Sequence, residues 1–272
     1  EMRNGIITDS LIIPGLGDPN SDMAFSVWSI SLEDISNPKV VARIKTGNLV
    51  GQMVEGIPAV GGSSPNSMAI TSDFVFVSNG NNDNITVIDV RNDSVIKDIF
   101  LKPDDAVRHF RGVIPFGLAV SPDGERLYVA EAGINAIGVI DLPSFKVMGH
   151  IPVGWFPSKV RVTPDGKKLV VTNAKGYGSG PNGGMNFREG PEGTYIGSLM
   201  KGTVSIIDIP PDNELEKMTR QVIANNFRKD KASKLLRVRK DNPVPLYGGQ
   251  KGSPLKHIVF ISKENRTYDE VF

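Results

Sequence analysis

Short apolar runs separated by polar turns fill most of the chain, and the segment from 117 to 153 shows this pattern most clearly. Ser121-Pro122-Asp123-Gly124 divides its first two runs, with proline fixing φ and Asp-Gly supplying a tight reversal. The pattern predicts four short antiparallel strands that form one sheet. The predicted strands cover 117–120, 127–130, 136–141 and 146–153.

The same arrangement recurs at a period of about 40 to 50 residues, which is typical of propeller blades with four strands each. Successive copies are anchored by Pro65, Pro115 and Pro157, and a partial copy at 25–32 and 39–47 precedes them. We therefore predict an all-β fold, a β-propeller over residues 1–226. We expect about four blades, as part of a ring of about seven.

The third blade carries a long insert, because its second strand ends near Asn173 and its third begins near Thr203. Loops longer than ~12–15 residues without structure of their own are often functional. No Gly-Lys-Ser/Thr helix start follows the glycine-rich part, which argues against a nucleotide-binding P-loop. The favoured interpretation is a loop that covers the propeller or packs on a neighbouring domain, and direct contact with a substrate is the alternative. Candidate ligand-binding residues of this insert are Tyr177, Asn182, Tyr195 and Lys201.

The pattern changes after residue 211, where apolar residues fall at helical spacing and a basic run follows at 228–240. We interpret 227–255 as a basic helical linker with a solvated face. Binding of nucleic acid or membrane is disfavoured, because no aromatic residues interleave the basic run and the net charge is only +1. The apolar residues at helical spacing are Leu215, Met218, Val222 and Ile223.

The amino-acid composition excludes several kinds of functional site. The 272 residues are 39% hydrophobic and 22% charged, as expected for a globular protein, and they include no cysteine. Disulfides, thiolate zinc sites, iron–sulfur clusters and covalently attached haem are therefore excluded. No apolar run approaches the ~20 residues of a membrane span. Copper or quinone redox chemistry is disfavoured, because His109, His150 and His257 are far apart in sequence.

The last seventeen residues, 256–272, have a different character. Residues 256–262 form a continuous apolar run, which predicts a strand buried on both faces, as in a parallel sheet. Ligands of such sheets lie at the carboxyl ends of the strands. Glu264 and Asn265 follow the run directly, and carboxylate and amide oxygens suit divalent cations.

Two resemblances add to these patterns. Ser-Pro-Asp-Gly, Leu-Tyr-Val-Ala and Val-Ile-Asp, in that order, resemble the YVTN or YncE-type repeat of bacterial β-propellers, and the likeness extends over about 64–209. Lys-Glu-Asn-Arg-Thr-Tyr-Asp at 263–269 resembles the opening motif of the phosphoesterase branch of the alkaline phosphatase superfamily. The stretch 195–202 is similar to proteins that join both parts. By this resemblance, 256–272 begins a phosphoesterase domain.

The phosphoesterase resemblance implies roles for individual residues. Glu264 and Asn265 would belong to a metal-bearing site, and Arg266 and Asp269 would hold the following loop. Zinc, calcium or manganese would be bound only by the complete phosphoesterase domain, and the propeller would need no cofactor. The nucleophile and the other metal ligands would follow Phe272, so we expect no catalytic residue in this chain, which we interpret as a fragment.

These expectations combine into one function and one alternative. The chain would be the scaffold or binding portion of an exported, metal-dependent phosphoesterase, located in the periplasm or at the cell surface as the resemblance implies. The propeller would dock against the phosphoesterase domain of the same protein, and open sheet edges would favour self-association. The alternative is a non-enzymatic surface or periplasmic binding propeller.

Overall fold

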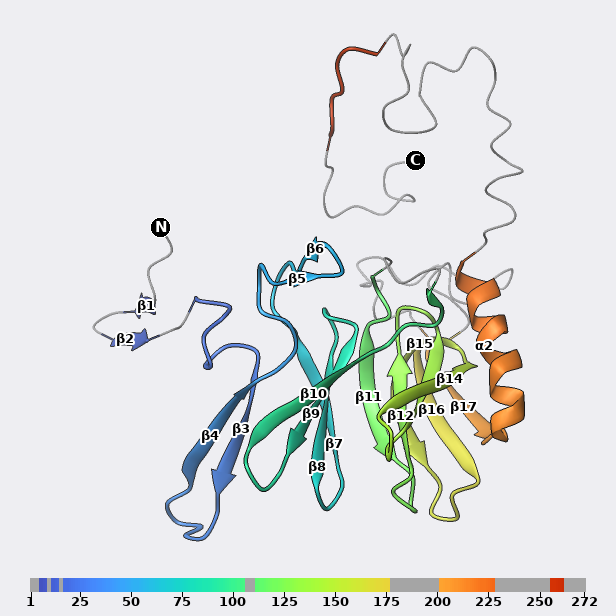
Figure 1. Cartoon of the computed structure of the whole chain (residues 1–272), viewed down its shortest axis with the longest axis horizontal. Coiled ribbons are helices and arrows are strands. Elements are labelled where there is room, and N and C mark those ends of the chain that lie inside the picture. The colour runs from blue at the N-terminus through green and yellow to red at the C-terminus, as the bar shows by residue number, and fades with distance from the viewer. Residues whose placement is uncertain are drawn as a thin grey trace, which may run out of the picture. The chain divides into compact units, whose positions relative to one another are not determined.

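The computed structural model describes residues 17–105, 111–176, 201–227 and 255–261, together with the backbone of two short strands before them. The chain divides into two compact units, Glu1–Phe227 and Arg228–Phe272. Among the described residues, the first unit consists of antiparallel sheets that follow one another along the chain, and one helix (Figure 1).

Two of the sheets are complete four-stranded meanders, in which each strand pairs with the next along the chain. They confirm the prediction of four-stranded blades. The first blade contains β7 (Pro65–Ile70), β8 (Phe74–Asn79), β9 (Asn84–Asp89) and β10 (Ser94–Phe100). The second blade contains β11 (Pro115–Val120), β12 (Arg126–Glu131), β13 (Ala136–Asp141) and β14 (Lys146–Pro152).

The remaining sheets have fewer strands among the described residues. A third blade consists of β15 (Trp155–Val162), β16 (Lys168–Gly176) and β17 (Thr203–Asp208). The predicted partial copy is present as the pair β3 (Ser26–Ser31) and β4 (Lys39–Lys45). Two small hairpins complete the list: β1 (Gly5–Thr8) with β2 (Leu11–Pro14), and β5 (Met53–Val54) with β6 (Ile57–Pro58).

An apolar core lies between each pair of successive sheets. Leu127 of β12 joins the cluster shared with the first blade, whereas its neighbour Tyr128 joins the cluster shared with the third blade. Alternate side chains of a strand point to opposite faces, so the second blade is buried on both sides. This stacking of antiparallel four-stranded sheets face to face makes the fold all-β and propeller-like.

Helix α2 (Asp212–Asn226) follows β17 and confirms the predicted helical spacing. Asp212 and Glu214 place negative charge in its first turn, where the helix dipole favours it. Leu215 and Val222 are buried against the blades, so the helix belongs to the first unit and precedes the predicted linker 227–255. Residues 228–254 lie outside the described residues. Among the residues described, no helix is long and apolar enough to cross a bilayer.

The prediction of a strand at 256–262 is wrong for residues 256–261, the part of it that the structure describes. Residues 255–261 have no regular secondary structure, and the side chains of Ile258, Val259, Phe260 and Ile261 are 81–91% exposed. A strand is stable only when a neighbouring strand pairs with its backbone groups. No described strand pairs with this segment, so its apolar sequence alone does not make it a strand.

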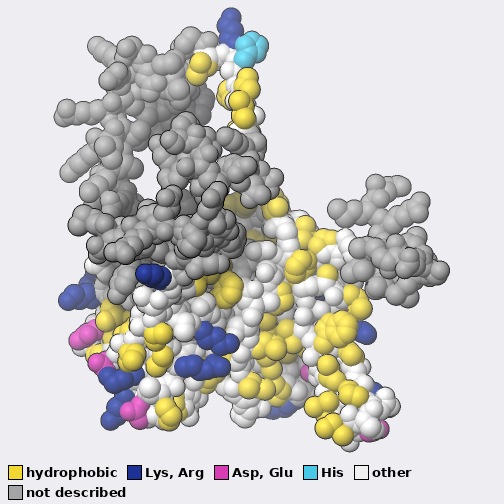
Figure 2. Space-filling view, turned by 180° about the vertical axis from the view of Figure 1, so that it is seen from behind, with side chains coloured by type: hydrophobic (Ala, Val, Ile, Leu, Met, Phe, Trp, Pro, Cys, Tyr) yellow, Lys and Arg dark blue, Asp and Glu magenta, His cyan; other side chains and the backbone are white. Residues whose placement is uncertain are grey.

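Hydrophobic side chains are also exposed on the β3–β4 pair, which Figure 2 shows as yellow atoms on the right of that view. Strands of the complete blades bury such residues between sheets, but β3 and β4 have only one described sheet beside them. The exposed residues on these strands include Trp28, Ile30, Val40 and Val41.

Candidate functional site

Equivalent positions on neighbouring strands form a row across each blade, and most of the residues in these rows are polar. The row joins the sixth residue of the second strand, the third residue of the third strand and the fifth residue of the outer strand. In the first blade these are Asn79, Thr86 and Asp98. The Asn79 amide donates to the Thr86 hydroxyl at 2.8 Å, and that hydroxyl donates to Asp98 Oδ1 at 2.5 Å. Burial raises the pKa of Asp98, which the hydrogen bond from Thr86 opposes.

In the second blade the same positions hold Glu131, Gly138 and His150. Glu131 Oε2 lies 2.7 Å from His150 Nδ1, and both side chains are buried. Gly138 makes room for this contact, because a Cβ there would lie 2.5 Å from Glu131 Oε1. Burial alone would lower the pKa of His150. The charge of Glu131, its hydrogen bond and a backbone hydrogen bond with Lys102 outweigh burial, so the pKa is raised.

The third blade repeats the row with Asn173 and Ser205, whose side chains are joined by a hydrogen bond of 2.9 Å. The first residue of each row is almost completely buried. One side-chain oxygen of each has no hydrogen-bond partner among the described residues: Asn79 Oδ1, Glu131 Oε1 and Asn173 Oδ1. The rows therefore repeat in position, burial and bonding, although the residue types differ.

Each row also contacts the residue two positions beyond the outer strand of the preceding sheet. The backbone N–H of Gly47 donates to Thr86 Oγ1 at 3.0 Å, and the backbone of Lys102 bonds His150. Gly154 approaches Asn173 so closely that a Cβ would lie 2.7 Å from Asn173 Cγ. The polar rows thus connect neighbouring blades, and their buried position indicates a structural role.

A second connection starts at the turn between the second and third strands of a blade. Asp83 accepts backbone N–H groups of Gly112 at 2.7 Å and Ile114 at 2.9 Å. In the next blade Asn135 Oδ1 accepts the N–H of Phe156 at 2.9 Å. Asp83 and Asn135 have φ of 52° and 55°, a left-handed conformation in which Asp and Asn are enriched.

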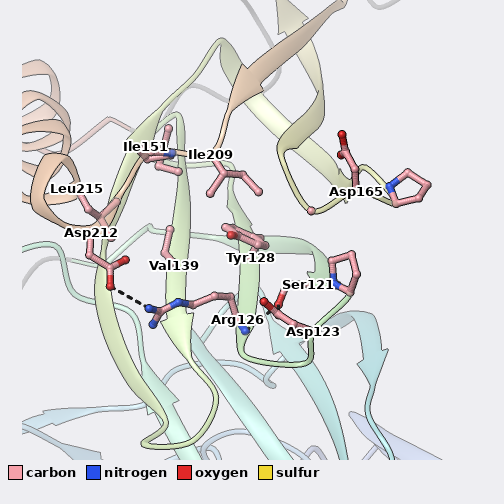
Figure 3. Close-up of a pocket in the computed structure, with 14 residues that line it drawn as sticks. Ser121, Asp123, Arg126, Tyr128, Val139, Ile151, Asp165, Ile209, Asp212 and Leu215 are labelled. Atoms are coloured by element: carbon pink, nitrogen blue, oxygen red, sulfur yellow. Dashed lines mark hydrogen bonds and ion pairs between the residues drawn. The ribbon is translucent and has the colours of Figure 1, made fainter.

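A pocket of about 320 Å³ opens between the second blade, the third blade and the start of α2 (Figure 3). Its floor is apolar and buried, whereas charged side chains from two equivalent Pro-Asp-Gly turns lie at its rim. The floor includes Tyr128, Val139, Ile151 and Leu215, and the rim includes Asp123, Arg126, Asp165 and Asp212.

Arg126 is held by two carboxylates at the pocket rim. Its guanidinium lies 2.8 Å from Asp141 and 2.9 Å from Asp212, which joins the second blade to the start of α2. The hydroxyl of Ser121 donates to Asp123 and lowers the pKa of that carboxyl. The hydroxyl of Thr163 does the same for Asp165, so both carboxylates of the turns stay ionised at neutral pH.

Most of the sequence-predicted site residues lie outside the described residues. These are Glu264 and Asn265 with the neighbouring Arg266 and Asp269, and Tyr177, Asn182 and Tyr195 of the insert. Lys201 is described and exposed, two residues before β17 begins. The pocket and the polar rows were not identified from the sequence. The equivalent Asp123 and Asp165 turns were the available signal, but their proximity depends on how the blades pack.

The three histidines lie in different segments of the chain. His150 is buried against Glu131, His257 lies in the exposed segment 255–261, and His109 lies outside the described residues. Within the described ranges, no group of three His, Asp or Glu side chains is arranged to hold a metal ion.

No protein-family model matches the chain, and no curated protein sequence matches it. Among solved structures, hydrazine synthase of Kuenenia stuttgartiensis is similar at 28% identity and a TM-score of 0.36, over 41% of this chain and 29% of that one. A catalytically inactive virginiamycin B lyase from Staphylococcus aureus, solved with quinupristin, is similar at 21% identity and a TM-score of 0.34. That likeness covers 42% of this chain and 36% of the lyase chain. The chain thus spans about a third of the length of either structure.

Proposed function

We propose that the blades are the scaffold and binding portion of an exported, metal-dependent phosphoesterase whose catalytic domain begins near residue 256. The observation that carries this proposal is the order of the parts along the chain. The Lys263–Asp269 motif follows the blades and belongs to the second compact unit, Arg228–Phe272. Separate compact units are what a scaffold joined to a catalytic domain requires.

The blades themselves support the scaffold role. Their polar rows and the contacts of Asp83 and Asn135 connect successive sheets through partly buried hydrogen bonds. Such networks fix one arrangement of the parts they join. In this proposal Glu264 and Asn265 contribute oxygen ligands to the metal site, and a bound divalent ion would stabilise negative charge on a phosphate ester.

Hydrolysis of p-nitrophenyl phosphate by a polypeptide that continues beyond Phe272 tests the proposal. We expect activity with zinc, calcium or manganese that is lost on chelation. Glu264→Gln should lower it by at least about 10- to 100-fold. Glu125→Gln, in an exposed turn of the second blade, is the matched control and should leave it unchanged. Absence of hydrolysis with all three ions would contradict the proposal.

A non-enzymatic binding propeller is the second candidate. The pocket between the second and third blades favours it, because its volume of about 320 Å³ and its apolar floor with a polar rim are typical of ligand sites. A ligand that binds this pocket in a protein without phosphoesterase activity would support this alternative.

A further inference from the structure

We propose that the pocket between the second and third blades binds a small organic ammonium ion with a short apolar body. The proposal does not depend on phosphoesterase activity, because every residue that it uses lies in the blades or in α2. The pocket combines three features: an unpartnered hydroxyl in its floor, apolar walls and an excess of negative charge at its rim.

The hydroxyl belongs to Tyr128, which lies across the middle of the pocket in Figure 3. This residue is only 3% exposed and lines the pocket. Its hydroxyl bonds no described residue, and it is not one of the fully buried unpartnered atoms, so it is in contact with water in the pocket. A polar group of a ligand can take the place of that water and bond the hydroxyl. Burial raises the pKa of Tyr128; the charge of Arg126 opposes this shift, and the charges of Asp123 and Asp212 add to it. The group is therefore protonated and can bond a ligand.

The walls around Tyr128 suit an apolar ligand body. Val139, Ile151 and Leu215 are each at most 5% exposed, and Ile209 completes the wall above the tyrosine ring in Figure 3. These side chains expose little surface of their own, so the apolar surface that leaves water is mainly that of the ligand's alkyl group, which contributes roughly 25 cal/mol per Å². The ring face of Tyr128 also attracts cations.

Charge at the rim selects the sign of the ligand. The rim has three carboxylates and one guanidinium, and Arg126 is already paired with Asp141 and Asp212. The bonds from Ser121 and Thr163 reach one oxygen, Oδ1, of Asp123 and Asp165. An ionised carboxylate accepts up to about four hydrogen bonds, so both aspartates can accept more. An ammonium group donates three hydrogen bonds and matches this rim.

Binding of three probes of equal length to the full chain tests the proposal. The probes are n-hexylammonium, 1-hexanol and hexanoate, and dissociation constants come from ligand-observed NMR at low ionic strength. We expect hexylammonium to bind about five-fold or more tightly than the other two. Equal affinity for all three, or a preference for hexanoate, would overturn the proposal.

Single substitutions test whether the ligand binds in this pocket. Asp165→Asn keeps the acceptor oxygen of its turn and should weaken hexylammonium binding about two- to five-fold without changing hexanol binding. Tyr128→Phe keeps the ring and should weaken binding of both about two- to ten-fold. Asp73→Asn is the matched control, because Asp73 lies in the corresponding turn of the first blade, away from the pocket. An equal effect of Asp73→Asn and Asp165→Asn would contradict the assignment.

Discussion

Glu131 and His150 are both buried and lie 2.7 Å apart, Oε2 to Nδ1, across the middle of the second blade, where they form an ion pair when His150 is protonated. The carboxylate reaches the imidazole over Gly138, the residue of β13 that pairs with His150 in the sheet. A buried charge pair of this kind contributes to a unique arrangement of its sheet, and removing one partner leaves the other charge uncompensated.

We expect this pair to make stability depend on pH. The folded-state pKa of His150 is raised above its ordinary value of 6.5. The contribution of the pair to the free energy of unfolding is therefore complete below about pH 6.5 and is lost as pH rises through the folded-state pKa. Urea unfolding between pH 5 and pH 9 measures this dependence.

Glu131→Gln should reverse the sign of that dependence. The substitution removes the charge that raises the pKa, whereas burial, which lowers it, remains. The buried imidazole would then be neutral, and stability would increase with pH through the range near 6.5. At pH 6 we expect a loss of about 3–5 kcal/mol. Glu125→Gln in the exposed turn is the control, and an unchanged pH profile in Glu131→Gln would contradict the role of the pair.

Gly138 should not tolerate a side chain while Glu131 is present. An added Cβ would lie 2.5 Å from Glu131 Oε1 and 3.0 Å from its Cδ, and His150 prevents the carboxylate from moving away. We expect Gly138→Ala to cost about 1–3 kcal/mol of unfolding free energy. In a double-mutant cycle with Glu131→Ala, the cost of Gly138→Ala should be smaller by at least about 0.5 kcal/mol. Additive effects would show that the two residues do not interact.

The strands were predictable because their signals are local. Pro122-Asp123-Gly124 marks one turn, and strongly apolar residues such as Leu127 and Tyr128 mark the strand that follows. The helical spacing of Leu215 and Val222 was also visible, and both are buried in α2. The run at 256–262 shows the limit of this reasoning, since a strand also needs a partner that sequence pattern does not supply.

The polar rows were not predictable from the same signals. Asn79 and Asp98 are nineteen positions apart, and the corresponding residues of the next blade are Glu131 and His150, of different chemical type. The two pairs correspond only because they occupy the same positions within their strands. The pocket was not predictable for a similar reason. The turns that carry Asp123 and Asp165 become neighbours only when two blades pack face to face.

The contact between the first and second blades can be tested at Asp83. Asp83→Ala would leave the partly buried N–H groups of Gly112 and Ile114 without this acceptor. Because water can reach partly buried groups, we expect a loss of about 1–3 kcal/mol of unfolding free energy for the two together. Asp83→Asn keeps one acceptor oxygen, so its loss of unfolding free energy should be about half that of Asp83→Ala. Asp93→Ala is the matched control. Asp93 has a similar φ of 49°, but its side chain accepts no N–H group of the next blade among the described residues. The loss of stability in Asp93→Ala therefore measures the effect of placing alanine in this backbone conformation. Equal losses at Asp83 and Asp93 in urea unfolding would contradict the prediction.

One hydroxyl of α2 contributes to the docking of the helix on the second blade. Thr219 Oγ1 accepts the backbone N–H of His150 at 2.8 Å and donates to the carbonyl of Leu215, also at 2.8 Å. His150 lies in β14, the outer strand of its sheet, so without the hydroxyl its N–H would lack an acceptor beneath the helix.

Thr219→Val, which keeps the shape of the side chain, should therefore lower the free energy of unfolding by about 1–3 kcal/mol. The amide hydrogen of His150 should also exchange with solvent faster, by an amount larger than the global loss of stability explains. Thr219→Ser restores the hydroxyl and should recover both the stability and the protection of that amide. If Thr219→Ser and Thr219→Val behave alike, the hydroxyl does not hold the helix against β14. The apolar packing of Leu215 and Val222 and the bonds of Asp212 and Asn226 would then position the helix.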